Sequence, residues 1–285
     1  MKKILIQLDT DPQPSSFDRV VAIDAGVDEL FSYGGVNGEN VTSLVHGAMF
    51  TRSPSDLKHT AIFIGGSDVA AGEALLAKVE SLFFGPIRVS VLLDSNGSNT
   101  TAAAAVRAAA RHMELADSRA VVLGGTGPVG HRAAQILASR GVEVTVTSRT
   151  LERARETCDR IREQIPAARL IPAVSRHGDF QGLLEGCQLL IAAGAAKVQF
   201  LKEDQWLKQS SLKVAIDLNA VPPTGLEGIG VTDKAKERGH VLCYGAIGIG
   251  GTKMKIHRAA VESLFEQHDR VLNTPEVFAI AEKIG

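Results

Sequence analysis

A glycine-rich turn constrains the fold of this chain more than any other feature. Residues 120–134 read AVVLGGTGPVGHRAA, which places Gly125, Gly127 and Gly130 between an apolar segment and a segment with helical spacing. In a strand–turn–helix unit the first glycine permits the tight turn, the second lets the backbone approach a pyrophosphate, and the third lets helix and strand pack closely. The predicted phosphate-binding residues are therefore Gly125, Thr126, Gly127, Pro128, Val129 and Gly130.

The segments around this turn support a dinucleotide site. The hydrophobic pattern predicts a strand over 120–123, a helix over 131–139 and a second, β-branched strand over 142–147. Because a chain with 28 glycines can match the glycine spacing by chance, the flanking strand and helix carry the argument. The alternative is a glycine-rich turn in an α/β domain that binds no nucleotide.

The residues after the second predicted strand bear on the choice of nucleotide. An NAD site usually has a carboxylate about 20 residues beyond the glycines, whereas this chain has Ser148 and Arg149 there and Arg153 one helical turn later. Guanidinium and hydroxyl groups suit a 2′-phosphate, which a carboxylate would repel. NADP is the predicted cofactor and NAD the alternative. A solvated, arginine-rich helix start is the competing interpretation of both arginines.

Composition excludes several classes of protein. The chain has 285 residues, 45% of them hydrophobic, and a formal charge of −1, which suits a soluble protein of two domains. It has no basic patch with interleaved aromatics and no run of roughly 20 apolar residues, so we expect neither nucleic acid nor a membrane as partner. Three widely spaced cysteines argue against a disulfide framework, and no metal-ligand spacing is present. We therefore expect a cytoplasmic protein without a metal site.

Strand-like and helix-like segments alternate along the chain, which is typical of parallel α/β sheets. Before the glycine turn, strands are predicted over 3–8, 29–32, 60–64 and 88–93, and helices over 69–82 and 99–113. After it, strands are predicted over 170–174, 189–192, 213–217 and 240–243, and a helix from 252 onward.

This order predicts an α/β protein of two domains with a cleft between them. The first is a parallel α/β substrate domain over 1–113, completed by C-terminal helices over 252–285, and the second is a Rossmann dinucleotide-binding domain over 114–251. Ligands of such sheets bind beyond the carboxyl ends of the strands. In the second domain these ends carry further predicted cofactor-binding residues, namely Ala193, Gly194, Asp217, Asn219 and Gly250.

Four segments carry a resemblance to a known family. They are LDTD at 8–11, LDSNGSNTTAAA at 93–104, GTGPVG at 125–130 and YGAIGIGGTKMK at 244–255. Together they closely resemble the methylene-tetrahydromethanopterin dehydrogenases of methylotrophic bacteria, from the first strand to the C-terminal helix. The resemblance implies an enzyme that oxidises 5,10-methylene-tetrahydromethanopterin to the methenyl form with NADP, or in some branches NAD, in formaldehyde and one-carbon metabolism. It also implies a homo-oligomer, for which a trimer is one arrangement.

The resemblance implies roles for individual residues. Lys253 matches a lysine at the family's active site and is the predicted catalytic residue. Two departures from the family pattern are the Ser148-Arg149-Thr150 segment, where the NADP-specific branch has a Gly-Arg-Lys-like one, and Thr252 in place of a more apolar residue. The matching substrate-binding residues are Asp94, Asn96, Asn99 and Thr100, with Asp9, Thr10 and Phe17 as weaker candidates.

The implied chemistry needs positioning more than acid–base catalysis. Hydride leaves a carbon between two nitrogens whose lone pairs stabilise the resulting cation, so no proton transfer is compulsory. We expect Lys253 to anchor a carbonyl or carboxylate of the substrate, while Asp94 or Asp9 supplies a compensating negative field.

Each of these residues also has an alternative interpretation in which its role is structural. Lys253 and Lys255 would be surface residues of a first helical turn, residues 95–101 a helix cap, residues 245–251 an inter-domain hinge and His257 a packing residue.

Two other functions stay open. A methylene-tetrahydrofolate dehydrogenase would perform the same chemistry on another carrier, but the Tyr-x-x-x-Lys pair of the folate enzymes is not found in the first predicted domain. A non-catalytic NADPH-sensing module would share the dinucleotide domain.

Overall fold

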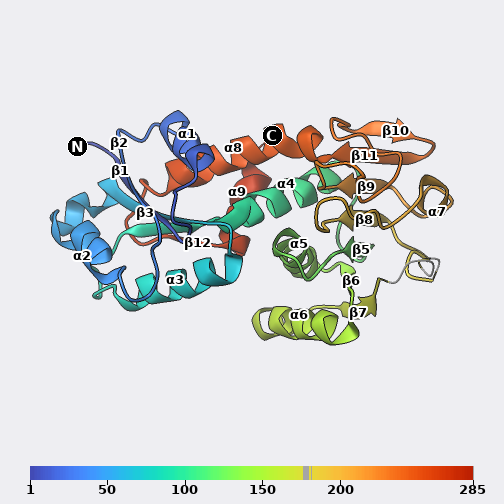
Figure 1. Cartoon of the computed structure of the whole chain (residues 1–285), viewed down its shortest axis with the longest axis horizontal. Helices are drawn as coiled ribbons and strands as arrows, with labels where there is room; N and C mark the ends of the chain where they lie inside the picture. The colour runs from blue at the N-terminus through green and yellow to red at the C-terminus, as the bar shows by residue number, and fades with distance from the viewer. Residues whose placement is uncertain (176–179, 181, 285) are drawn as a thin grey trace. The chain divides into compact units, whose positions relative to one another are not determined.

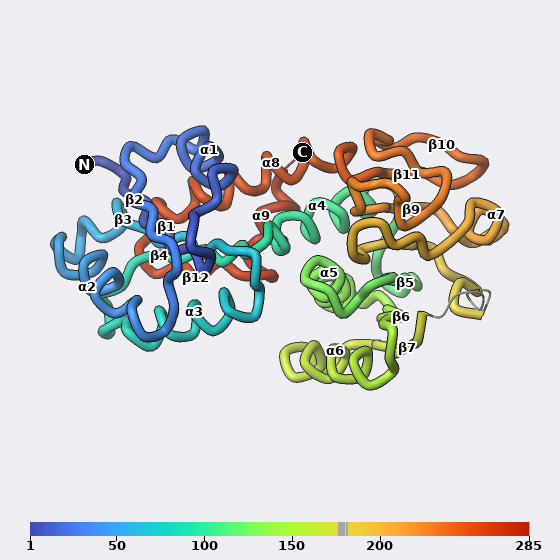
Figure 2. The backbone as a smooth tube through the Cα atoms, viewed as in Figure 1, coloured from blue at the N-terminus to red at the C-terminus, as the bar shows by residue number. Residues whose placement is uncertain are grey.

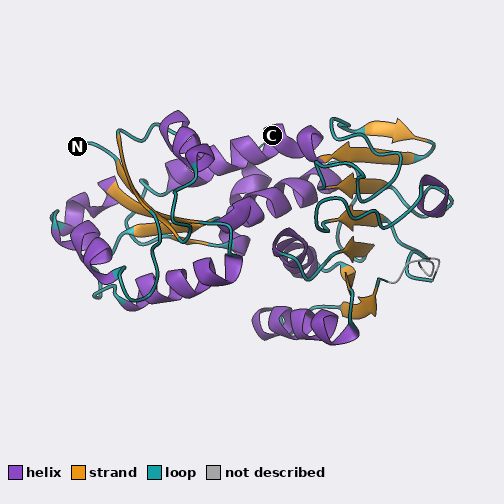
Figure 3. Cartoon of the chain, viewed as in Figure 1, coloured by secondary structure: helices purple, strands orange, loops and turns teal. Residues whose placement is uncertain are grey.

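The computed structural model describes residues 1–175, 180 and 182–284 (Figure 1). The chain forms two compact units, one made of residues 1–100 and 254–285 and the other of residues 101–253. Each unit has its own sheet with helices packed around it (Figure 3), so the predicted α/β fold is confirmed.

The sheet of the first unit has five strands in the order β12-β4-β3-β1-β2, and all neighbouring strands pair in parallel. The central strand β3 is buried along its whole length because helices cover both faces of the sheet, as expected for a parallel sheet. The strands are β1 (Ile4–Asp9), β2 (Glu29–Tyr33), β3 (Thr60–Gly65), β4 (Ser90–Leu93) and β12 (Val271–Leu272).

Helices of the first unit follow the strands and begin at the carboxyl edge of the sheet. Helix α1 starts after a cap in which the hydroxyl of Ser15 accepts from the backbone N–H of Asp18, and Asp68 caps α3 in the same way through two backbone N–H groups. The remaining turns are 3₁₀ helices before β3 and after β4. The helices are α1 (Ser16–Asp24), α2 (Thr42–Phe50), α3 (Val69–Ser81) and α9 (Thr274–Lys283), with 3₁₀ helices η1 (Pro54–His59) and η2 (Ser95–Gly97).

The C-terminal segment completes the first sheet. Val271 and Leu272 pair with Val91 and Leu92 of β4, and Figure 2 shows the red end of the chain returning to the blue and cyan strands. Two long helices cross from one unit to the other in sequence: α4 (Ser98–Ala110) and α8 (Ala246–Ser263).

The second unit has a seven-stranded sheet in the order β10-β11-β9-β8-β5-β6-β7. Apart from the antiparallel edge strand β10, this is the strand order of a Rossmann domain, and its order reverses between β5 and β8. The elements are β5 (Arg119–Leu123), α5 (Pro128–Ser139), β6 (Glu143–Ser148), α6 (Leu151–Gln164), β7 (Leu170–Val174), β8 (Leu189–Ala192), α7 (Glu203–Trp206), β9 (Val214–Asp217), β10 (Lys236–Arg238) and β11 (Val241–Gly245).

Gly245 ends β11, and Gly248, Gly250 and Gly251 lie in α8. Helix α8 begins at Ala246, six residues before the predicted start. A Cβ on Gly245 would overlap the carbonyl oxygen of Gly230, and a Cβ on Gly248 would overlap that of Asp233. These two glycines therefore let the start of α8 pack against the backbone of residues 230–233.

Within the described part of the chain, no helix is both long and apolar enough to cross a membrane.

Candidate functional site

The glycine turn of the second unit is closely packed where it meets β6 and α5. Gly124 has a φ of +69°, so it is the residue that makes the left-handed turn, a role expected for Gly125. A Cβ on Gly125 would lie 2.8 Å from Val146 Cγ1, and a Cβ on Gly130 would overlap the carbonyl oxygen of Gly124. Gly125 is thus restricted to glycine by its packing against β5 and β6, and Gly130 by the close approach of α5 to the turn.

Helix α5 begins directly after this turn. Gly127 is its N-cap and has no side chain to satisfy the first N–H groups, and Pro128 takes the first helical position, where an N–H is not needed. The N–H groups of a helix's first turn have no acceptor within the helix, and Val129 and Gly130 occupy that turn. An anionic group fits such a helix start.

A cavity of about 270 Å³ adjoins the turn. The residues that line it are Gly124, Thr126, Gly127, Ser148, Arg149, Arg153, Ser175, Ala193, Gly194, Ala195, Val198 and Phe200. The structure therefore brings seven of the predicted cofactor residues together around one cavity. Gly125, Pro128, Val129 and Gly130 build the turn behind it.

Polar side chains line the part of the cavity that borders the carboxyl end of β6. The hydroxyls of Thr126 and Ser148 lie 3.2 Å apart, and Arg149 and Arg153 are exposed beside them. Ser175, which follows β7, donates its backbone N–H to the carbonyl oxygen of Ser148. Sequence reasoning missed Ser175 because its place beside Ser148 depends on the pairing of β6 with β7.

Two predicted cofactor residues shape a loop instead of lining the cavity. Asp217 is 1% exposed, and its carboxylate accepts from the backbone N–H groups of Asn219 and Leu226. Burial raises the pKa of Asp217, partly offset by these hydrogen bonds. Asn219 donates to the carbonyl oxygen of Ala195, one of the cavity residues.

Gly250, another predicted cofactor residue, lies in the second turn of α8 with open space around it.

In the first unit, the carboxylates after the strands hold loops together. Asp9 is 1% exposed and accepts from the backbone N–H groups of Asp11 and Ser15. Asp11 in turn accepts from the backbone N–H and the hydroxyl of Ser67, which follows β3. The loops that leave β1 and β3 are therefore tied to each other at the carboxyl edge of the sheet.

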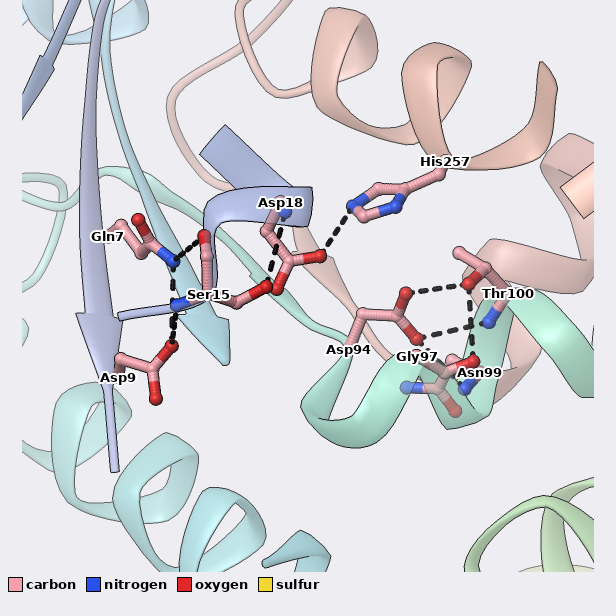
Figure 4. A network of polar contacts seen from close by, with 9 residues as sticks. All are labelled: Gln7, Asp9, Ser15, Asp18, Asp94, Gly97, Asn99, Thr100 and His257. Atoms are coloured by element: carbon pink, nitrogen blue, oxygen red, sulfur yellow. Dashed lines mark hydrogen bonds and ion pairs between the residues drawn. The ribbon is translucent and has the colours of Figure 1, made fainter. Parts of the chain in front are cut away.

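Asp94, Asn99 and Thr100 form a second buried group, at the start of α4 (Figure 4). Asp94 accepts from the backbone N–H groups of Asn99 and Thr100 and from the Thr100 hydroxyl at 2.6 Å. The amide of Asn99 donates to the carbonyl oxygen of Leu93, and its oxygen accepts from the hydroxyl of Thr274 in α9. These side chains make contacts that a structural cap would make.

The other predicted substrate residues are more open. Asn96 is exposed and has a φ of 55°, the left-handed conformation that Asn tolerates better than most residues. Phe17 is 50% exposed in the first turn of α1. The buried hydroxyl oxygen of Thr10 lies against Gly66, where a Cβ would overlap it. Asn96 and Phe17 are thus the predicted residues that offer surface to a ligand.

Lys253 lies in the third turn of α8 and is half-buried, so it is not the first-turn surface residue of the alternative interpretation. One turn further, His257 is 0% exposed. Its ring stacks on Phe63 with centroids 5.7 Å apart, and its Nε2 lies 4.0 Å from Oδ1 of Asp18 (Figure 4). Sequence reasoning did not select Asp18, because this pairing joins α1 to a helix far along the chain.

Among the described residues, no group of three or more His, Cys, Asp or Glu side chains is placed to hold a metal ion.

Two family models match different parts of the chain. The model described as methylene-tetrahydromethanopterin dehydrogenase, N-terminal, matches residues 16–96, which lie in the first unit. The model described as shikimate / quinate 5-dehydrogenase matches residues 107–227, which lie in the second unit.

Full-length relatives occur in Methylorubrum extorquens. The bifunctional protein MdtA of that organism is 42% identical over 290 residues, covering 100% of this chain and 99% of the relative. Its NAD(P)-dependent methylenetetrahydromethanopterin dehydrogenase is 29% identical over 297 residues, covering 100% and 99%. Among solved structures, quinate dehydrogenase from Corynebacterium glutamicum in complex with NAD has a TM-score of 0.50 at 13% identity and covers 99% of both chains, a likeness of fold.

Proposed function

The chain belongs to the methylene-tetrahydromethanopterin dehydrogenase family, and from this premise we propose that it transfers hydride from 5,10-methylene-tetrahydromethanopterin to NADP⁺. The observation that carries the proposal is that the likeness to these proteins spans both units. The shikimate / quinate model covers the second unit alone, so it supports the dinucleotide domain and not a shikimate substrate.

We assign the second unit to the cofactor. The first turn of α5 would hold the pyrophosphate, and Ser148, Arg149 and Arg153 would hold a 2′-phosphate. NADP⁺, when bound, accepts a hydride at its nicotinamide ring. Because a site that carries arginines can also admit NAD⁺, NAD⁺ is a second cofactor of the proposal.

We assign the first unit to the pterin substrate. Asn96 and Phe17 would contact it directly, while Asp9, Asp94, Asn99 and Thr100 hold the loops that present them. Thr10 completes this edge beside Gly66. Lys253 would anchor a carbonyl or carboxylate of the substrate, since a cation next to the reacting carbon would oppose the positive charge that forms there.

A cytoplasmic location and a homo-oligomer, with a trimer as one arrangement, belong to the same proposal. The location is supported by Cys158, Cys187 and Cys243, which are all buried free thiols.

The test is anaerobic formation of reduced nicotinamide after the protein is mixed with formaldehyde, tetrahydromethanopterin and NADP⁺. Parallel reactions contain NAD⁺, or tetrahydrofolate as the carrier. NADPH formation with the methanopterin is the expected result, and faster formation with tetrahydrofolate would assign the chain to folate chemistry. Nucleotide binding without turnover on either carrier would contradict the proposal and favour an NADPH sensor.

The Lys253 assignment has its own readout. Lys253→Ala should raise KM for the pterin by about tenfold or more, as loss of a charge-assisted hydrogen bond would, and leave the dissociation constant of NADP⁺ unchanged. Unchanged turnover and unchanged KM would exclude the anchoring role.

A further inference from the structure

Hydride transfer moves a positive charge onto the substrate. The C–H bond of the methylene carbon breaks and both of its electrons leave with the hydride to the nicotinamide ring. The carbon is left in an N–C–N cation, NADP⁺ becomes NADPH, and no proton is released. A fixed negative charge near this carbon would favour the product and the transition state that leads to it.

The carboxylates at the carboxyl edge of the first sheet differ in their contacts and in their exposure. Asp9, Asp11, Asp68 and Asp94 accept hydrogen bonds from backbone N–H groups of their own or neighbouring loops. Asp9 and Asp94, the two expected sources of a negative field, are each only 1% exposed. Their charge is directed at the protein backbone, which holds the loops in place.

Asp18 has a different environment. It lies in the first turn of α1, which begins at the same edge because it follows β1, and it is the chain neighbour of the exposed Phe17. Its side chain is 15% exposed, so part of the carboxylate reaches the surface. A carboxylate in the first turn of a helix is stabilised as an anion by the helix dipole.

The buried side chain of His257 faces the carboxylate of Asp18. Its imidazole contacts two aromatic rings: it stacks on Phe63, and its centroid lies 6.4 Å from that of the Phe17 ring. Its Nε2 faces Oδ1 of Asp18 at 4.0 Å (Figure 4). The ring therefore lies against one side of the Asp18 carboxylate, and the Ser15 hydroxyl fixes the backbone of Asp18 by accepting its N–H.

We propose that Asp18 supplies the negative charge that stabilises the methenyl cation, and that His257 is the positioning residue that orients it. This inference rests on the proposed function, since it concerns the substrate of that reaction. It assigns the compensating field to a partly exposed carboxylate in place of the buried Asp9 and Asp94.

The experiment compares binding of the methenyl carrier with binding of tetrahydromethanopterin, which lacks the cation. Asp18→Asn should weaken methenyl binding by about tenfold to a hundredfold, the range expected for a unit charge a few ångströms away in partly screened surroundings. Binding of tetrahydromethanopterin should change by less than about twofold, and kcat should fall with little change in KM for NADP⁺. Asp18→Glu should restore part of the methenyl preference. Asp24→Asn, which removes an exposed carboxylate from the last turn of the same helix, is the matched control.

Two variants of His257 separate positioning from packing. His257→Phe keeps an aromatic ring against Phe63 and removes both nitrogens, so it should lose the methenyl preference. His257→Gln loses the ring but retains an amide near the position of Nε2, so it should keep more of that preference. The opposite order would assign His257 to packing alone. Unfolding temperatures and NADP⁺ binding report whether each variant is folded.

The outcomes distinguish this inference from the proposed function. If the unmodified protein forms NADPH but Asp18→Asn binds the methenyl carrier as tightly as before, only the role of Asp18 is overturned. Equal losses for the methenyl carrier and tetrahydromethanopterin would likewise overturn it, because they would indicate a structural role. If the unmodified protein has no turnover with either carrier, the proposed function and this inference fall together.

Discussion

The hydroxyl oxygens of Thr126 and Ser148 lie 3.2 Å apart, which joins the glycine turn to the end of β6. One residue belongs to the turn that would hold a pyrophosphate, and the other begins the segment that would hold the ribose. Arg149 and Arg153 line the same cavity as these two residues. The contact thus joins the glycine turn to the start of the segment that carries both arginines.

Arg149→Gln tests the predicted preference for NADP. The variant loses the guanidinium that would bind the 2′-phosphate, and charge-assisted hydrogen bonds of this kind contribute about 1.5–3 kcal/mol. KM for NADP⁺ should rise by about tenfold to a hundredfold, whereas KM for NAD⁺ should change by less than about twofold. Steady-state kinetics with both nucleotides provide the measurement. Arg155→Gln, on α6 but not among the residues that line the cavity, should leave both values unchanged. Parallel increases in KM for both nucleotides would contradict a 2′-phosphate role.

Gly130→Ala tests the packing of α5 against the turn. The added methyl group would overlap the carbonyl oxygen of Gly124, which belongs to the backbone and can move only with the turn. We expect a loss of about 1–3 kcal/mol in the free energy of unfolding, together with weaker NADP⁺ binding. Urea unfolding and a nucleotide titration measure the two effects. Gly182→Ala, where no heavy atom lies within 4 Å of the added carbon, should cost less than about 0.5 kcal/mol.

The strands of the second unit were predictable because their signal is local. Residues 170–174 and 189–192 are apolar runs bounded by polar or small residues, and the structure has strands with these bounds. The two-residue β12 and the three-residue β10 escaped prediction because such short segments have no periodicity and are strands only through their partners. The start of α8 was placed too late because glycine has low helix propensity, while close packing requires it at Gly248.

The candidate site was predictable to the extent that its residues follow one another in sequence. The glycine turn and the Ser148–Arg153 segment meet at one cavity, because the βαβ unit brings its successive loops to the same edge. Ser175 and Asp18 could not be found in this way, since each meets its partner through distant segments. The uses of Asp94 and Asp217 also needed the structure, because sequence alone does not tell a carboxylate that caps a backbone from one that meets a ligand.

Asp94→Asn tests whether this buried carboxylate acts on the protein or on the substrate. Its oxygens accept from two backbone N–H groups and one hydroxyl, and an amide offers a single acceptor oxygen in their place. Each buried donor left unpaired costs about 1–3 kcal/mol, so the urea midpoint should fall clearly. An unchanged midpoint combined with weak pterin binding would show instead that Asp94 acts on the substrate.

The three cysteine thiols should resist modification in the folded protein. Burial raises the pKa of Cys158 to about 11 and the pKa values of Cys187 and Cys243 to about 12, so the reactive thiolate is scarce near neutral pH. We expect a thiol reagent such as dithionitrobenzoate to react slowly with the native protein and with three thiols after unfolding in urea. Fast reaction of one thiol in the native protein would show that its segment opens readily.

The contact between His112 and Tyr244 predicts a loss of stability in mild acid. His112 Nε2 lies 2.6 Å from the Tyr244 hydroxyl oxygen, and burial, followed by the charge of Arg111, lowers the pKa of His112 from its ordinary value of 6.5. As the pH falls below 6.5, the unfolded chain takes up a proton at this residue that the folded chain does not, so the free energy of unfolding falls until the lowered pKa is reached. Thermal unfolding of the unmodified protein and of His112→Gln, measured at several pH values from neutral downward, should show a shallower dependence for the variant. Identical slopes would mean that His112 does not contribute to the acid sensitivity of the fold.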